Sequence, residues 1–152
     1  MKQRATVVCS SGTRLLLVSR DGARWSLPGG RPKTGEALQR TASRELLEET
    51  SLHATDVRYI FAVNGINTCH HVFLAGYSEA TRLAPRNEIT HCRWAKIAEI
   101  SRLDTSVATR AIVEILVMSA DRSNGSAAPY RQRAKTLPEQ AQVAFDANAW
   151  FA

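Results

Sequence analysis

The sequence lacks the features that mark secreted, membrane-spanning or zinc-stabilised chains. Its three cysteines, Cys9, Cys69 and Cys92, cannot all pair with one another and do not have the spacing of a zinc site. Its apolar runs, such as Leu15 to Val18, are too short to cross a bilayer. The first residues enter a strand-like pattern without the apolar stretch of a signal peptide. We therefore expect a cytoplasmic protein with buried, inert thiols and no membrane partner.

Acidic and aromatic residues are also scarce. Fourteen Asp and Glu residues stand against twenty Lys and Arg residues, which gives a net charge of +6. That balance suits an anionic partner, although a solvated basic surface would account for the charge alone. Aromatic side chains make up only 7% of the chain. A nucleobase substrate should need an aromatic clamp, so this scarcity slightly favours a substrate that is rich in phosphate.

The rest of the composition is that of one folded domain followed by a tail. The chain has 152 residues, of which 44% are hydrophobic and 22% charged, as in an ordinary globular domain. We expect a domain over residues 1–119, then a linker and a short C-terminal helix within residues 120–152. The helix would carry four apolar groups, Val143, Phe145, Trp150 and Phe151. These groups would dock on the domain or on a second subunit of a homodimer, with a frayed tail as the alternative.

Turn signals and apolar periodicity divide the expected domain into strands and helices. Strands are predicted at residues 5–10, 14–19, 57–63 and 69–77, and within residues 88–97. Helices are predicted at residues 36–49 and 106–119. Residues 28–32 should be irregular, because two prolines remove N–H donors and two glycines admit unusual backbone angles. The pattern predicts an α/β fold with a mixed sheet covered by helices.

The strongest chemical signal is a cluster of glutamates in the first predicted helix. Glu45, Glu48 and Glu49 stand at i, i+3 and i+4, so their carboxylates share one helix face. Neighbouring like charges at this spacing repel by about 0.2–0.5 kcal/mol per pair, and a cation removes that cost. Carboxylate oxygens are hard ligands that select Mg²⁺ or Mn²⁺, ions that also bridge to substrate phosphates.

The residues around this cluster could support a metal site. Arg44 can reach Glu48 one turn further on, and its planar fork could also hold Glu36 in the preceding loop. Gly30 follows another glycine, and this flexible backbone would let the Gly30 carbonyl approach a metal closely. A Glu-rich helix alone is usually just a solvated face. The combination at fixed spacing predicts a metal centre beside a basic surround.

This spacing resembles the Nudix box, Gly-x5-Glu-x7-Arg-Glu-U-x-Glu-Glu-x-Gly-U, in which U is a large aliphatic residue. Eight of its nine specified positions match: Gly30, Glu36, Arg44, Glu45, Leu46, Glu48, Glu49 and Leu52. Ser51 stands where the family has a glycine that ordinarily ends the helix in a left-handed conformation. The strand order extends the resemblance to about residue 119.

The resemblance implies an α/β/α sandwich that hydrolyses a diphosphate linkage with Mg²⁺ or Mn²⁺. By position, Glu48 and Glu49 would bind the metal together with the Gly30 carbonyl. Glu45 would bind metal or orient the attacking water, although the catalytic base differs among relatives. The two remaining box residues, Arg44 and Glu36, would orient the groups around them.

Residues outside the box supply further candidates. Glu88 precedes the last predicted strand, where many relatives place another glutamate near the metal; an exposed loop glutamate is the equal alternative. His70 and His71 must point to opposite faces of a strand, so one could line a cleft, although packing or exposure is the simpler interpretation. Trp25 should pack beneath the loop. Four basic residues flank the box and could hold phosphates: Arg20, Arg24, Arg31 and Lys33.

We therefore expect a metal-dependent pyrophosphohydrolase of the Nudix type. Its partner would be an anionic small molecule that contains a diphosphate: a nucleoside diphosphate derivative, a dinucleoside polyphosphate or a diphosphoinositol polyphosphate. We do not expect nucleic acid as a partner. The alternative is a non-catalytic Nudix-like module that senses a ligand or binds RNA. Such modules tend to lose acidic box residues, whereas all three helix glutamates are present here.

Overall fold

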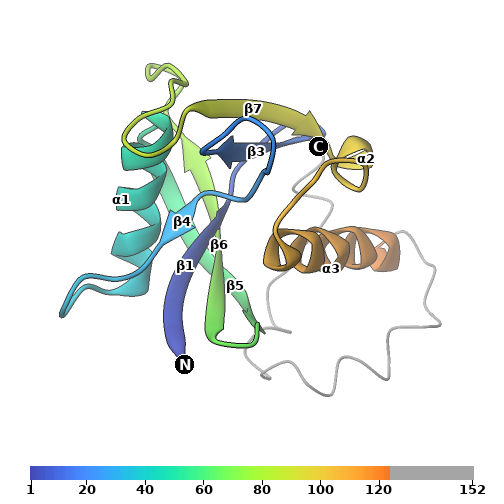
Figure 1. Cartoon of the computed structure of the whole chain (residues 1–152), viewed down its shortest axis with the longest axis horizontal. Coiled ribbons are helices and arrows are strands. Elements are labelled where there is room, and N and C mark those ends of the chain that lie inside the picture. Colours follow the sequence, from blue (N-terminus) through green and yellow to red (C-terminus); the bar gives the residue numbers. More distant parts are fainter. Residues whose placement is uncertain (124–152) are drawn as a thin grey trace.

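The computed structural model describes residues 1–123, which form two β-sheets flanked by helices (Figure 1). The elements in chain order are β1 (Lys2–Val8), β2 (Ser10–Ser11), β3 (Arg14–Ser19), β4 (Gly29–Gly30), α1 (Leu38–Thr50), β5 (Ala54–Asn64), β6 (Thr68–Tyr77), β7 (His91–Lys96), α2 (Ile97–Ile100) and α3 (Val107–Ser123). The expected C-terminal helix lies outside the described residues and stays a prediction. No helix within residues 1–123 is long and apolar enough to span a membrane.

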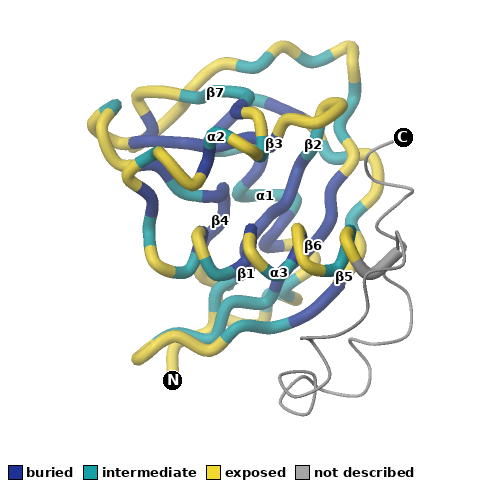
Figure 2. The backbone as a smooth tube through the Cα atoms, turned by 90° about the vertical axis from the view of Figure 1, so that its right-hand side faces the viewer, coloured by how far each residue is buried: buried dark blue, intermediate teal, exposed yellow. Residues whose placement is uncertain are grey.

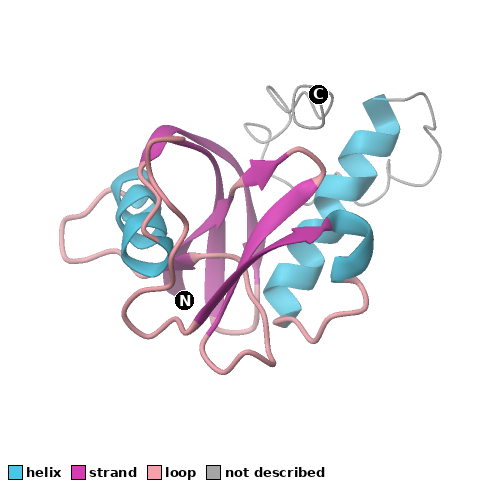
Figure 3. Ribbon diagram, turned by 90° about the horizontal axis from the view of Figure 1, so that it is seen from above, coloured by secondary structure: helices cyan, strands magenta, loops and turns pink. Residues whose placement is uncertain are grey.

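The larger sheet is mixed. Its four strands run in the order β4-β1-β6-β5, with β1 parallel to β6 and the other neighbours antiparallel. The smaller sheet is antiparallel, in the order β2-β3-β7. Seen from above, helices lie on both sides of the strands (Figure 3). The predicted α/β sandwich with a mixed sheet is therefore confirmed.

Two hydrophobic cores lie on opposite faces of the strands. Successive side chains of a strand point to opposite faces, and β1 accordingly places Val8 in one core and Val7 in the other. The first core includes Ile112 and Leu116 of α3, and the second includes Leu46 of α1. The buried segments run through the middle of the molecule in Figure 2. α1 is thus anchored by its apolar side, while its glutamates lie outside the buried core.

The Gly-Gly segment is the main correction to the predicted fold. The sequence predicts irregular backbone there, but Gly29 and Gly30 form β4 and pair with Thr6 and Ala5 of β1. A Cβ atom on Gly29 would lie 2.1 Å from the Ala5 carbonyl oxygen. These residues pair as a strand because they have no side chains to keep the two backbones apart. The two predicted helices differ at their ends, since α1 begins at residue 38 and α3 runs to residue 123, and the short helix α2 is an addition that the sequence does not predict.

Ser51, the one departure from the Nudix box, ends α1 in the usual left-handed conformation. Its φ angle is 66°, and its N–H donates to the Leu47 carbonyl at 2.9 Å. Its hydroxyl donates to the Ala84 carbonyl, also at 2.9 Å. A residue with a side chain is disfavoured in this conformation, and the extra hydrogen bond offsets part of that cost.

Substitution of Ser51 should separate these two effects. Ser51→Ala keeps the unfavourable conformation and loses the hydrogen bond, so the free energy of unfolding should fall by about 1 kcal/mol. Ser51→Gly loses the bond but relieves the conformation, so it should stay within about 0.5 kcal/mol of wild type. Denaturant titration of wild type and the two variants measures the order of their stabilities. Equal stability of the alanine and glycine variants would show that the conformation costs nothing here.

Candidate active site

α1 lies against β4 (Figure 1), and two of its glutamates contact the β4 backbone. Glu49 Oε2 accepts a hydrogen bond from the Gly29 N–H at 3.0 Å. A Cβ atom on Gly30 would lie 2.2 Å from Glu45 Oε1. Because neither residue has a side chain, the β4 backbone can lie directly against two of the three carboxylates.

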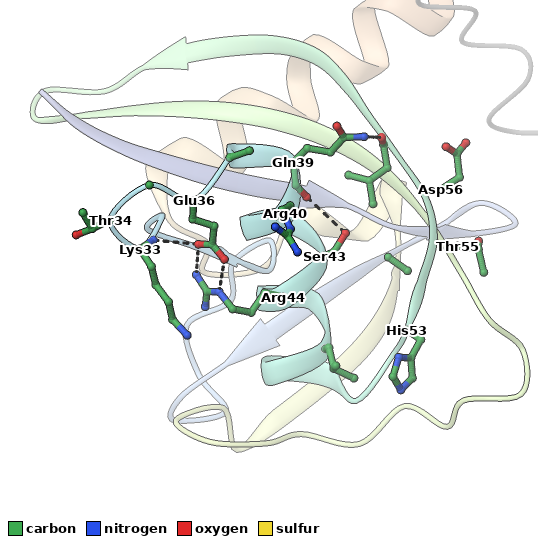
Figure 4. Close-up of a pocket in the computed structure, with 15 residues that line it drawn as sticks. Lys33, Thr34, Glu36, Gln39, Arg40, Ser43, Arg44, His53, Thr55 and Asp56 are labelled. Atoms are coloured by element: carbon green, nitrogen blue, oxygen red, sulfur yellow. Dashed lines mark hydrogen bonds and ion pairs between the residues drawn. The ribbon is translucent and has the colours of Figure 1, made fainter.

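The Arg44 guanidinium holds three carboxylates at once. Its Nε and Nη2 donate to the two Glu36 oxygens at 2.8 and 2.9 Å, in the paired arrangement shown in Figure 4. Its Nη1 donates to Glu45 Oε1 at 2.8 Å and to Glu48 Oε2 at 2.9 Å. The predicted contacts of Arg44 with Glu36 and Glu48 are confirmed. The contact with Glu45 is an addition that the spacing does not predict.

Glu36 is fixed from several sides and therefore fixes Arg44. Its Oε2 also accepts hydrogen bonds from the Lys33 N–H and the Thr41 hydroxyl, each at 2.9 Å. The hydrogen bonds from Arg44, followed by the one from Lys33, lower the pKa of Glu36 to about 2. Glu36 is thus ionised at neutral pH and orients the guanidinium that links the other carboxylates.

The pKa of Glu49 is shifted in the opposite direction to that of Glu36. Burial, with a smaller contribution from the charge of Glu45, raises the pKa of Glu49 to about 7. The Gly29 N–H and the more distant charges of Arg4 and Arg20 act against this rise. A carboxylate whose charge is so poorly compensated is a candidate for binding a cation or exchanging a proton.

The three helix glutamates share a face but do not converge on one point. Within residues 1–123, no three His, Cys, Asp or Glu side chains already form a group that could hold a metal ion. Glu45 and Glu48 turn to Arg44, whereas Glu49 turns to Gly29. The donor chemistry nevertheless fits a hard divalent cation, because three carboxylates project from one helix face and the charge of Glu49 is undercompensated. Binding an ion would require these side chains to reorient.

Glu88 lies on the loop before β7 and contacts the cluster indirectly. Its carboxylate forms an ion pair with Arg20 at 2.5 Å, and its side chain is 68% exposed. Arg20 in turn lies near enough to Glu49 to lower the pKa of that carboxyl group. Glu88 is therefore linked to the helix glutamates through Arg20, and its role as a metal ligand stays a prediction.

Arg4 is a site residue that the sequence analysis misses. Its Nη2 donates to the Gly29 carbonyl at 2.5 Å. Burial lowers the pKa of Arg4, whereas the charges of Glu49 and Glu45 raise it. Only the pairing of β1 with β4 brings Arg4 to this position. The position of Arg4 directly before the buried residues 5–8 of β1 is the signal that could have drawn attention to it.

The basic residues predicted to bind phosphate are not all at one place. Arg31 lines a cavity of about 350 Å³ beside β4, together with Arg4 and His70. Arg24 and Lys33 do not line that cavity. Lys33 instead lines a larger hollow between α1 and β5 (Figure 4), together with Glu36 and Arg44. Glu45, Glu48 and Glu49 line neither cavity. The smaller one, named here the β4 cavity, is linked to β4 through Arg4, which lines it and donates to the Gly29 carbonyl.

The histidines and Trp25 also have defined places. His70 Nδ1 lies 3.0 Å from the Thr6 hydroxyl, whereas His71 Nε2 lies 2.6 Å from Gln3 Oε1. His70 lines the β4 cavity and His71 does not. Trp25 is buried and does not line the cavity, which confirms that it packs within the fold.

Known proteins that are similar in sequence point to one family. The NUDIX domain family matches residues 1–114. A Bacillus subtilis (strain 168) protein, provisionally named an 8-oxo-dGTP diphosphatase, is 45% identical over 49 residues, which are 32% of this chain and 33% of that protein. The chain thus aligns with only about a third of the length of that relative.

Solved structures share the arrangement of helices and strands. A provisionally assigned Nudix hydrolase family member from Chromobacterium violaceum gives a TM-score of 0.70 at 25% identity, over 84% of this chain and 82% of that one. The MutT Nudix hydrolase of Burkholderia pseudomallei gives 0.65 at 22% identity, over 74% and 95%. The Nudix domain of Shewanella oneidensis NrtR, complexed with ADP ribose, gives 0.63 at 18% identity, over 75% and 84%. The fold and the box-bearing helix define a Nudix domain. This chain belongs to the Nudix family.

The raised pKa of Glu49 predicts a pH-dependent stability in metal-free protein. The carboxyl group holds its proton more tightly when folded than at its ordinary pKa of 4.5, so stability should fall as pH rises from about 4.5 to about 7. Glu49→Gln removes this penalty and should be more stable than wild type by up to ~3 kcal/mol at pH 8, and by much less at pH 5. Chemical denaturation in EDTA at both pH values measures the two differences. If the variant and wild type differ in stability by the same amount at pH 5 and pH 8, folding does not raise the pKa of Glu49.

Proposed function

We propose that this chain is a divalent-metal-dependent pyrophosphohydrolase that cleaves a diphosphate linkage. The observation that carries the proposal is the partly buried Glu49 carboxylate, which lies beside Glu45 against the Gly29–Gly30 backbone with its charge undercompensated. Membership of the family supports this reaction, because Nudix hydrolases act on pyrophosphate bonds and generally use divalent ions. The three glutamates supply the type of oxygen ligand that these ions prefer.

The ion would be Mg²⁺ or Mn²⁺, held by Glu45, Glu48 and Glu49 with the Gly30 carbonyl, and Glu88 is a further candidate ligand. Such an ion would lower the pKa of a bound water and neutralise charge that develops on the phosphoryl oxygens.

The chain's own residues would orient the reacting groups. Glu36 keeps Arg44 in place through two hydrogen bonds. Arg44 in turn keeps Glu45 and Glu48 on one side of α1. Glu45, which lies against Gly30, is the candidate to orient the attacking water and to accept its proton.

Two classes of substrate fit a Nudix hydrolase with this site. The relatives favour nucleotides, since one is named for 8-oxo-dGTP and another is bound to ADP ribose. The β4 cavity favours a phosphate-rich molecule such as a dinucleoside polyphosphate or a diphosphoinositol polyphosphate, because no Phe, Tyr or Trp among the described residues lines it. Trp25 cannot act as a clamp there, since it is buried edge-on to His91. We favour the phosphate-rich class.

Removal of one helix carboxylate should stop hydrolysis without unfolding the protein. Glu48→Gln and Glu49→Gln should each lower Mg²⁺-dependent kcat/KM by roughly 100-fold or more, because an ion contributes several kcal/mol to the transition state. Neither variant should have a lower melting temperature at pH 8. Glu79→Gln, at an exposed loop position, is the matched control and should keep full activity. Near-normal turnover in both helix variants would contradict the metal assignment.

The substrate itself is found with a panel assayed in Mg²⁺ and in Mn²⁺. The panel includes nucleotides, nucleotide sugars, dinucleoside polyphosphates, diphosphoinositol polyphosphates and capped RNA. Hydrolysis of at least one diphosphate is expected, with the phosphate-rich compounds preferred. If none is cleaved while RNA binds equally well to wild type and Glu49→Gln, the chain is the non-catalytic module instead.

A further inference from the structure

The β4 cavity takes no part in the chemistry assigned to the helix glutamates. We infer that it binds a second anionic group of the substrate, a phosphate beyond the scissile diphosphate, and that Arg4 is its main specificity-determining residue. This inference rests on the proposed function and deepens it by naming the substrate class.

The lining of the β4 cavity is suited to phosphate and poorly suited to a base. Two guanidinium groups, from Arg4 and Arg31, line it together with the His70 imidazole. Five hydroxyl groups complete the polar part of the lining, from Thr6, Ser26, Thr68, Ser106 and Thr109. No Asp, Glu, Phe, Tyr or Trp from the described part of the chain lines it. An anion would therefore meet donors and positive charge, without a competing carboxylate and without a Phe, Tyr or Trp ring on which a base could stack.

The cavity and the glutamate cluster meet at one residue. The Gly29 N–H binds Glu49, and the Gly29 carbonyl binds Arg4. Glu49 and Glu45 also lie near enough to Arg4 for their charges to raise its pKa. A diphosphate placed at the glutamates would therefore have the Arg4 guanidinium as a neighbour. A guanidinium has five N–H donors, and the described residues engage Arg4 at only one nitrogen. The others remain for a ligand.

Positive charges are crowded around Arg4. The charges of Arg20 and Arg31 lie near enough to lower the pKa of Arg4, in addition to the effect of its burial. His70 pairs directly opposite Arg4 across the parallel β1–β6 ladder. Its Nδ1 is held by the Thr6 hydroxyl, so Nε2 is the ring nitrogen left to contact a ligand. A phosphate bound among these guanidinium groups would relieve their repulsion.

Binding of a non-hydrolysable probe tests the cavity apart from catalysis. Inositol hexakisphosphate has many phosphates and no diphosphate, and calorimetry in EDTA measures its Kd for the full chain without metal. Arg4→Gln should weaken this binding by about 10-fold to 100-fold, the range for a lost charged hydrogen bond. Arg31→Gln, at an exposed position of the cavity wall, should weaken it less. Arg14→Gln, exposed on β3 and outside the cavity, removes the same charge and should leave Kd within about 2-fold, because distant surface charges are screened.

Substrate selectivity provides the second measurement. The ratio of kcat/KM for a phosphate-rich substrate to kcat/KM for ADP ribose should fall at least about 10-fold in Arg4→Gln and stay constant in Arg14→Gln. Diadenosine polyphosphates and diphosphoinositol polyphosphates, assayed separately, identify which source of phosphate the cavity accepts.

The outcomes separate this inference from the proposed reaction. Equal weakening of probe binding in Arg4→Gln and Arg14→Gln would overturn the inference, whatever the enzyme hydrolyses. Probe binding that depends on Arg4, in a chain that cleaves no diphosphate, would support the anion site and refute the reaction. If Arg4→Gln does not fold, Arg31→Gln decides, and a Kd equal to that of Arg14→Gln would then overturn the inference.

Discussion

A single guanidinium group, that of Arg44, holds the carboxylates on the acidic face of α1 in place. Glu45, Glu48 and Glu36 would repel one another, yet all three accept hydrogen bonds from Arg44. The guanidinium is planar, always charged and rich in donors, so it can satisfy several carboxylates in a fixed geometry where a lysine could not. The candidate metal ligands are thus gathered on one side of the helix by the protein itself.

The two glycines of β4 allow its backbone to approach the neighbouring elements closely. The strand lies so close to β1 that a Cβ on Gly29 would overlap the neighbouring carbonyl, and so close to α1 that a Cβ on Gly30 would overlap Glu45. The larger sheet and the box helix therefore meet across a layer that is one backbone thick. Gly29 can therefore form hydrogen bonds with both Arg4 and Glu49.

The features that the sequence predicts well are local. Helix periodicity places the three glutamates on one face, and spacings of four and eight residues suffice to predict the contacts of Arg44 with Glu48 and Glu36. The mixed sheet also follows from the order of strands and helices.

The features that the sequence does not predict depend on chain segments that meet only in the fold. Arg4 contacts Gly29 across 25 positions because β1 pairs with β4, and a pattern that predicts irregular backbone at Gly29 cannot foresee this pairing. For the same reason the sequence cannot separate Arg31, which lines the β4 cavity, from Arg24, which does not. Spacing shows which residues are polar, whereas the tertiary structure decides which of them share a cavity.

Hydrogen bonds join the end of α1 to the segment that leads to β7. The Ala84 N–H donates to the Thr50 carbonyl at 2.9 Å, the Arg86 N–H donates to the Glu49 carbonyl at 3.2 Å, and the Ser51 hydroxyl returns a bond to Ala84. The last turn of α1 and the segment between β6 and β7 are therefore held to each other, so a displacement of one displaces the other. Any insertion or shortening between β6 and β7 would pull on the backbone of an acidic residue more than thirty positions earlier in the chain.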